Sequence, residues 1–267
     1  MAYELKTTSD YLREREVFLI QIDMSEYLLD YYHQRRDLAP STSRAHDTRL
    51  KDLIACFAIH LTARTALETH GWTLHIVSEE PYSLFVTGST GEIDPAGIAR
   101  GFLVGHILTD HIRHSDTNAL HAQCTYRGNT FRSYVPSESA GIVDMVEAFY
   151  RQSEQRPIRI LLSETSDTAI GLAALPGYDP AWFESVDLRT LAAAEGGADR
   201  TRMRSCAFTF TCECSAEKLA PFFRALGEGG INELYGEDEE LVITCPRCGR
   251  RMTLSRAALM AEEGEPG

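Results

Sequence analysis

The chain has 267 residues, of which 43% are hydrophobic and 24% are charged, so its composition is that of a folded globular protein. Asp and Glu number 39 against 26 Lys and Arg, which gives a formal net charge of −13. Because a surface this acidic repels nucleic-acid phosphates and anionic lipids, we expect neither a nucleic acid nor a membrane as a partner.

The start of the chain lacks the pattern of a secretory signal. Four acidic residues lie among the apolar residues of segment 1–21 and interrupt any apolar signal core. The longest apolar stretch, 53–61, is too short to span a bilayer. We therefore expect a soluble cytoplasmic protein.

The first predicted element is a helix that begins at a capping residue, Ser43 or Asp47, and is closed by Gly71. Its apolar residues have the three-and-four spacing of a buried helical stripe: Leu50, Leu53, Ile54, Phe57 and Leu61. Cys56 lies on this helix, and we expect it to be a small buried hydrophobic residue.

Alternating apolar residues separated by short turns predict two hairpins, 72–77 with 82–87 and 120–126 with 130–135. A helix is expected over 140–151, followed by a strand over 158–162 that pairs with 168–175. Because strands and helices mix without strict βαβ alternation, we expect an α+β fold with a large N-terminal domain of mixed sheet and helix.

The composition changes near residue 177. Segment 178–207 is rich in Ala, Gly and charged residues and has few large apolar ones, which predicts a linker with at most one short, poorly packed helix. We therefore divide the chain into an N-terminal domain over 1–177, a linker over 178–207 and a small C-terminal domain over 208–267.

Two closely spaced cysteine pairs mark the C-terminal domain: Cys212 with Cys214, and Cys245 with Cys248. Zinc takes four thiolates in a tetrahedron, and each pair can supply half of them. Gly249 suits a tight turn after the second pair. We expect one zinc ion per chain, because a domain this small gains much of its stability from a metal. The residues alone leave a purely structural site and a redox role both open.

The segment between the cysteine pairs has its own predicted elements. Ser215 is a suitable cap for a helix over 215–226, which a Gly-rich turn follows. A strand over 240–244 then leads into the second pair.

Other chemistry-bearing residues give weaker signals. We expect His106, Asp110, His111 and His114 to share a solvated helix face, because no acidic partner completes a recognised metal motif. Cys124 and Cys206 are unpaired in the sequence and are interpreted as incidental oxidation sites. No nucleotide-binding or acyl-transfer motif occurs, so we do not expect an enzyme.

Segments spread along the chain resemble the family of heat-shock protein 33, a redox-regulated chaperone. The zinc module of that family resembles Phe-Thr-Cys-Glu-Cys-Ser at 210–215 and Val-Ile-Thr-Cys-Pro-Arg-Cys-Gly at 242–249. The end of its first domain resembles Phe-Tyr-Arg-Gln-Ser-Glu-Gln at 149–155, with Pro157 beyond, and its Arg-Gly turn resembles 99–102. These matches follow the family's order.

The resemblance implies an ATP-independent holdase that binds unfolding client proteins. In the family, zinc on four reduced cysteines keeps the chaperone inactive. Oxidants then form two disulfides, which here would be Cys212–Cys214 and Cys245–Cys248, with zinc release and exposure of apolar surface. The resemblance also implies an active homodimer in which the first domain supplies the interface.

The chain departs from the family between Gln155 and Cys212. This segment is short and lacks the Leu-rich helical stretch that normally precedes the first cysteine, so we expect client binding with weaker redox control. Two alternatives stay open. One is a zinc-ribbon interaction module without a switch, although six Lys or Arg against eleven Asp or Glu in 212–267 disfavour nucleic acid. The other is a thiol-disulfide oxidoreductase that uses Cys245 and Cys248, although Gly249 and two arginines follow this pair.

Overall fold

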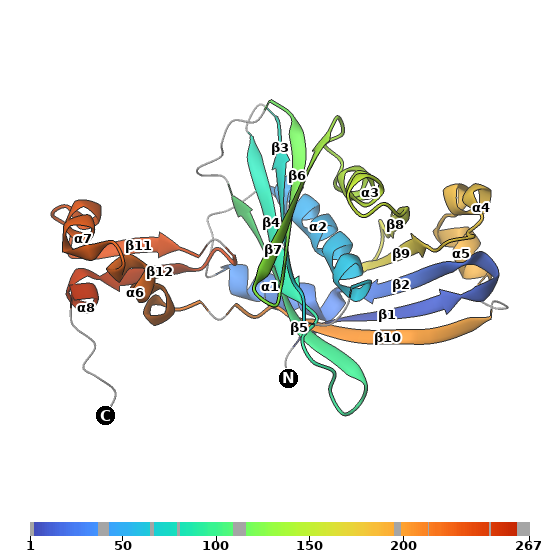
Figure 1. Cartoon of the computed structure of the whole chain (residues 1–267), viewed down its shortest axis with the longest axis horizontal. Helices are drawn as coiled ribbons and strands as arrows, with labels where there is room; N and C mark the ends of the chain where they lie inside the picture. Colours follow the sequence, from blue (N-terminus) through green and yellow to red (C-terminus); the bar gives the residue numbers. More distant parts are fainter. Residues whose placement is uncertain are drawn as a thin grey trace.

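The computed structural model describes residues 3–36, 43–64, 67–78, 81–108, 116–194, 199–212, 214–245 and 247–260. Within these ranges, helices pack against one large mixed sheet, and a small module with its own hairpin lies at one end of the molecule (Figure 1). The predicted α+β class is therefore confirmed.

Ten strands of the described residues form the large sheet, in the order β7-β6-β3-β4-β5-β10-β1-β2-β9-β8. Neighbouring strands pair antiparallel except β10 and β5, which are parallel. The strands are β1 (Glu4–Leu12), β2 (Val17–Asp23), β3 (Thr69–Ile76), β4 (Tyr82–Ser89), β5 (Ile98–Leu108), β6 (Asn118–Tyr126), β7 (Asn129–Ser137), β8 (Ile158–Leu162), β9 (Thr168–Ala174) and β10 (Arg200–Thr209).

Helix α2 (Arg44–Thr62) is the centre of the main core and contacts strands from both halves of the sheet. The Ser43 side chain accepts a hydrogen bond from the His46 amide, so Ser43 is the cap of the two predicted candidates, and Asp47 lies in the first turn. The predicted apolar stripe is fully buried. The predicted end at Gly71 is wrong, because the helix ends at Thr62 and Gly71 lies within β3.

The remaining elements of the N-terminal part surround this core. They are α1 (Ser25–Arg36), a 3-10 turn (Arg13–Arg15), α3 (Ile142–Gln152), α4 (Pro180–Ser185) and α5 (Leu188–Ala194). The three predicted strand pairs are confirmed as β3 with β4, β6 with β7, and β8 with β9. The predicted helix over 140–151 is confirmed as α3, which buries Ile142, Val146 and Phe149.

Segment 178–207 differs most from the prediction of a linker. Helices α4 and α5 build a second core, in which Phe183, Val186 and Leu191 pack with residues of β2 and β9. Strand β10 then lies inside the sheet, between β5 and β1 (Figure 1). The segment is therefore integrated into the N-terminal fold. The segment can join the sheet with few apolar residues, because basic side chains of β10 form ion pairs with the neighbouring strand.

Asp10 on β1 is the partner that accommodates the basic residues of β10. Its carboxylate is 3% exposed and accepts hydrogen bonds from both Arg200 and Arg202. Burial by itself raises the pKa of Asp10, but the two arginine hydrogen bonds outweigh it and hold the pKa below its usual value. The ionised pair therefore stabilises the fold above the usual aspartate pKa of about 4 and loses this contribution as the pH falls through the lower folded pKa.

We expect Asp10→Asn to lower the free energy of unfolding by about 2 kcal/mol at pH 7, since two charged hydrogen bonds are weakened in a buried position. Urea unfolding at pH 7 and pH 3 measures this, and the difference from wild type should shrink at pH 3. Asp199→Asn is the control, because Asp199 pairs with Arg13 in a position that is 55% exposed and should change stability by less than about 0.5 kcal/mol. Equal effects of both substitutions would contradict the prediction.

The C-terminal module has a small core of four buried residues: Ala220, Ile231, Tyr235 and Leu259. Its elements are α6 (Ala216–Arg224), α7 (Gly227–Tyr235), β11 (Glu240–Thr244), β12 (Arg251–Ser255) and α8 (Arg256–Met260). Ser215 caps α6 as predicted, by accepting a hydrogen bond from the Lys218 amide. The predicted Gly-rich turn is wrong. It is helix α7, because burial of Ile231 and Tyr235 outweighs the low helix propensity of glycine.

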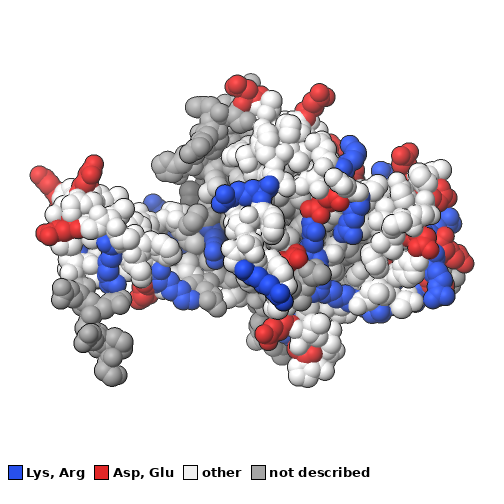
Figure 2. Space-filling view, viewed as in Figure 1, with Lys and Arg blue, Asp and Glu red and all other residues white. Residues whose placement is uncertain are grey.

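The surface agrees with the acidic composition. On the face shown in Figure 2, acidic and basic side chains are interspersed, and acidic ones gather at the outer end of the C-terminal module. Among the described residues, no helix has the length and apolar character needed to cross a membrane.

Candidate metal centre

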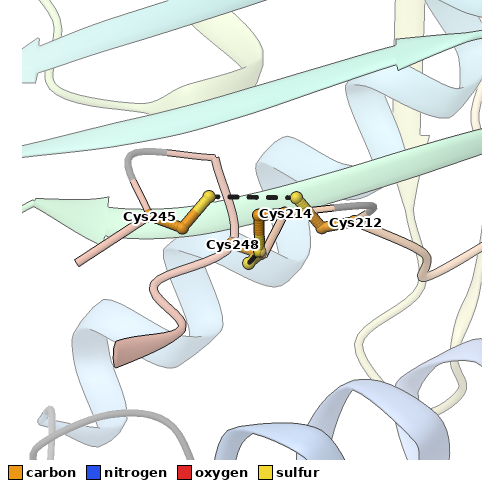
Figure 3. A group of neighbouring side chains, drawn as sticks. All are labelled: Cys212, Cys214, Cys245 and Cys248. Atoms are coloured by element: carbon orange, nitrogen blue, oxygen red, sulfur yellow. Dashed lines mark hydrogen bonds between the residues drawn. The ribbon is translucent and has the colours of Figure 1, made fainter. Parts of the chain in front are cut away.

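The four cysteines of the C-terminal module come from two separate loops that face each other (Figure 3). Cys212 follows β10 and Cys214 precedes α6, while Cys245 and Cys248 lie in the turn between β11 and β12. Two backbone hydrogen bonds close this turn: Cys245 N–H donates to Arg250 O at 2.8 Å, and Gly249 N–H donates to Cys245 O at 2.9 Å. The hairpin therefore holds the second pair in a fixed loop.

The four sulfurs converge on one point. The Sγ atoms of Cys212 and Cys245 are 3.8 Å apart, those of Cys214 and Cys248 are 3.5 Å apart, and all four lie within 4.8 Å of one another. Four thiolates around a tetrahedral zinc ion, with Zn–S bonds of about 2.3 Å, are separated by about 3.8 Å. The arrangement can therefore hold a metal ion, and its spacing fits zinc.

Hydrogen bonds divide the charge unequally among the thiols. The Cys248 thiol donates a hydrogen bond to the Cys245 sulfur, and the backbone amides of Cys248 and Arg247 donate to it as well. Burial raises the pKa of Cys245, but these hydrogen bonds outweigh burial and lower the pKa to about 4. Donating the same bond raises the pKa of Cys248 well above its usual value, and burial raises the pKa of Cys214 to about 11. These hydrogen bonds therefore favour the thiolate form of Cys245, which is the form that binds metals.

The cysteine loops also pack against the large sheet domain. Cys245 and Cys248 are 3% and 7% exposed and belong to the same apolar cluster as the main core. Gly249 has a φ of +76°, and a β-carbon there would lie 2.6 Å from Nδ1 of His106 on β5. Only glycine allows this close approach. The four-cysteine cluster is therefore part of the junction between the C-terminal module and the sheet.

Phe210 joins β10 to the first cysteine loop and anchors this junction. Its ring is buried and makes edge contacts with Tyr27 and Tyr31 of α1, with centroid distances of 5.9 and 5.5 Å. Because Phe210 precedes Cys212 by two residues, its packing anchors the start of the first cysteine loop to the sheet domain.

The other sequence-predicted residues have mixed outcomes. His106 lies on strand β5, so the predicted helix face is wrong for it, while Asp110, His111 and His114 lie outside the described residues. Cys56 is fully buried in α2, as predicted. Cys206 is also buried, and its thiol contacts the hydroxyls of Thr7 and Thr62.

Sequence reasoning missed a second group of side chains of the types that bind metals. Cys124 lies beside His70 and Glu68, with the three ligand atoms within 4.8 Å of one another. No local motif joins these residues, because Cys124 is distant from the other two in the chain.

The fold and the cysteine geometry can now be compared with known proteins. Residues 42–255 match the family model described as Hsp33 protein. The chain belongs to the Hsp33 family. The resemblance that the sequence motifs indicated is therefore confirmed across most of the chain.

Curated relatives that match are named 33 kDa chaperonin. The chaperonin of Lactobacillus delbrueckii subsp. bulgaricus is 29% identical over 101 residues, which are 38% of this chain and 33% of the relative. That of Pectobacterium atrosepticum is 26% identical over 146 residues, which are 46% of this chain and 50% of the relative. The chain thus matches a third to a half of the length of these Hsp33 relatives.

A solved structure matches over nearly the whole length. The 33 kDa chaperonin from Thermotoga maritima, an Hsp33 homologue, has a TM-score of 0.67 at 13% identity, and the match covers 97% of each chain. At this identity the likeness shows the fold, including a large sheet domain followed by a C-terminal module.

Proposed function

We propose that the chain is an ATP-independent holdase chaperone whose client binding is controlled by a zinc site of Cys212, Cys214, Cys245 and Cys248. The observation that carries this proposal is the convergence of the four sulfurs at the junction of the two domains. A metal there would hold both cysteine loops together and against the sheet. The family membership supports binding of unfolding client proteins.

The C-terminal module depends on such a site because its own core is small. Four buried residues make up the separate core, which is little for a module of this size. Binding of zinc to sites of this class contributes about 10–16 kcal/mol, which is folding free energy when no preformed site exists in the unfolded chain. The four reduced thiols are therefore expected to determine whether the module is folded.

Oxidation of the thiols removes their capacity to bind a metal. We propose that peroxide converts one thiolate of each pair to a sulfenic acid and releases hydroxide, which takes up a proton from solvent to become water. The neighbouring thiol then attacks the sulfenic acid sulfur, which forms the disulfide and releases a second water molecule. The products are Cys212–Cys214 and Cys245–Cys248, and each disulfide consumes one peroxide. The closest sulfur contacts now run between the pairs, so these disulfides require the two loops to separate.

Separation of the loops would uncover apolar surface at the domain junction. Cys245, Cys248 and Phe210 are buried there against the main core. The module already exposes other apolar side chains: Phe222 is 73% exposed and Leu226, four residues later, is 55% exposed. We infer that oxidation increases client binding from a measurable level in the reduced state, which agrees with the weaker redox control expected from the short segment before Cys212.

We propose a cytoplasmic protein that acts as a homodimer when oxidised, with the N-terminal domain as its interface and unfolded proteins as partners. The division into a client-binding domain and a C-terminal redox-sensor domain stays a prediction. A thiol oxidoreductase is less well supported, because strand β12 follows Cys248. Thioredoxin-like enzymes instead place a Cys-x-x-Cys pair at the start of a helix.

Suppression of client aggregation tests this function. The purified chain, either zinc-loaded and reduced or treated with peroxide, is mixed with a chemically unfolded client, and light scattering is followed without ATP. We expect partial suppression by the reduced chain and several-fold stronger suppression by the oxidised one. Absence of suppression in both states would contradict the chaperone function, and equal suppression would contradict the switch.

A further inference from the structure

A second group of ligand-type side chains lies on the sheet, remote in sequence from the four cysteines. Glu68 immediately precedes β3 and is two residues before His70, so both side chains point to the same face. Cys124 on β6 is the register partner of His70. His70 Nε2 lies 2.9 Å from Glu68 Oε2 and 3.8 Å from Cys124 Sγ. Strand pairing thus brings a carboxylate, an imidazole and a thiol together.

We propose that Glu68, His70 and Cys124 bind a second divalent metal ion of the zinc class, with water as the fourth ligand. Three protein ligands of these types and one open position are typical of zinc sites that exchange ligands. Zn²⁺ with one thiolate, one carboxylate and a neutral imidazole has no net charge, so the site can be partly buried without a further counterion.

The observed spacing is close to that of a tetrahedral site. Ordinary zinc bond lengths separate an imidazole nitrogen from a thiolate by about 3.6 Å and from a carboxylate oxygen by about 3.4 Å. The Nε2–Sγ distance of 3.8 Å already agrees with this value. The Nε2–Oε2 distance of 2.9 Å is that of a hydrogen bond, and a shift of the partly exposed Glu68 carboxylate by about half an ångström accommodates the ion.

A buried relay fixes the orientation of the His70 ring. His70 Nδ1 is 3.1 Å from Nε2 of His60, and Nδ1 of His60 is 2.8 Å from the hydroxyl of Tyr150. Metal-binding histidines generally use their second nitrogen in this way. When both imidazoles carry the proton on Nδ1, His70 donates to His60, His60 donates to Tyr150, and the His70 Nε2 lone pair is available to the ion. Each imidazole keeps one ring proton when the ion binds, and the proton of the Cys124 thiol is released to solvent.

The site opens into a cavity that gives a metal ion access. The cavity has a volume of 260 Å³, and Glu68, His70 and Cys124 all line it. Arg64 and Glu154 also line it and form an ion pair with each other, so they add no net charge. This volume holds several water molecules, including the fourth ligand.

The same residues do not form a cysteine–histidine–acid catalytic triad. In such a triad, one nitrogen of the histidine faces the nucleophile and the acid contacts the other nitrogen. Here Glu68 and Cys124 both face Nε2, while Nδ1 contacts His60. Convergence of three ligand atoms on one point favours a metal.

Zinc stoichiometry of the full chain tests the proposal. Wild type and the variants Glu68→Gln, His70→Gln and Cys124→Ser are reduced, loaded with Zn²⁺ and dialysed, and zinc per chain is measured by mass spectrometry. We expect each variant to hold one zinc fewer than wild type, whatever the four-cysteine site binds. Cobalt loading provides a second readout, since Cys124→Ser should lose the thiolate-to-cobalt absorption of this site alone.

Cys206→Ser is the matched control, because this buried thiol lies between the hydroxyls of Thr7 and Thr62 and belongs to neither ligand-type cluster found among the described residues. It should keep the wild-type zinc content. Glu68→Gln changes a partly exposed side chain and protects the test against misfolding of the other variants. Zinc content equal to wild type in Glu68→Gln and Cys124→Ser would overturn the proposal.

Discussion

Cys245→Ser is expected to unfold the C-terminal module while the ten-stranded sheet stays folded. Cys245 supplies one of the four converging sulfurs, and its loss leaves three ligands in a module that has only a small core. Because a structural zinc site contributes about 10–16 kcal/mol, removing one ligand should exceed the intrinsic stability of the module. Hydrogen exchange measured by mass spectrometry should show loss of protection in α6, α7 and β11.

The sheet strands serve as the internal reference for this experiment. Amides of β3, β4 and β5 should keep their protection, since among the described residues these strands pair with one another, with β6 and with β10, and with no strand of the module. Cys206→Ser again provides the matched control and should leave α6 and α7 protected. Full protection of these helices in Cys245→Ser, or in wild type after zinc chelation, would contradict a metal-dependent module.

Gly101→Ala is expected to lower the free energy of unfolding by about 3 kcal/mol, because the added methyl group has no space. Gly101 lies on β5 and pairs with Phe208 of β10. A β-carbon there would lie 1.8 Å from the carbonyl oxygen of Ser89, a backbone atom that cannot rotate away. The strand connection must therefore shift, and urea unfolding measures the cost.

Gly71→Ala is the matched control on β3. Its added β-carbon would have its nearest neighbours at 3.7 Å, an ordinary contact distance, so stability should be unchanged or slightly higher. A Gly101→Ala chain as stable as the Gly71→Ala chain would contradict the close approach of β5 to the end of β4.

Local patterns predicted the elements in which apolar side chains recur toward the core at the spacing of a helix or a strand. The stripe of α2 and the hairpin of β3 with β4 follow this rule, because each buries most of its apolar residues against the core. The hairpin of β6 with β7 follows it only in part, since Leu120 and Val135 are buried whereas Phe131 and Tyr134 are more than half exposed. Strand β10 does not follow it. Its basic residues have the composition of a linker. They fit inside the sheet because their hydrogen bonds are accepted by Asp10, which is 192 residues before Arg202. Such non-local pairing has no signal in the segment itself.

The two candidate metal sites also differ in whether the local sequence could predict them. Cys245 and Cys248 are close in sequence and so are Cys212 and Cys214, so the four-cysteine cluster could be predicted although its halves are far apart. The second cluster depends on pairing between β3 and β6, which the sequence did not specify. Only that register places Cys124 beside His70.

The central claim is that the four thiols of the module are one metal site and one redox unit. Its most direct test is zinc and disulfide analysis of the Cys124→Ser chain, in which the second proposed site is removed, before and after peroxide. The account predicts release of one zinc ion, loss of four thiols and peptides linked as Cys212–Cys214 and Cys245–Cys248. Zinc retained after these thiols are oxidised, or disulfides that join Cys212 to Cys245, would contradict it.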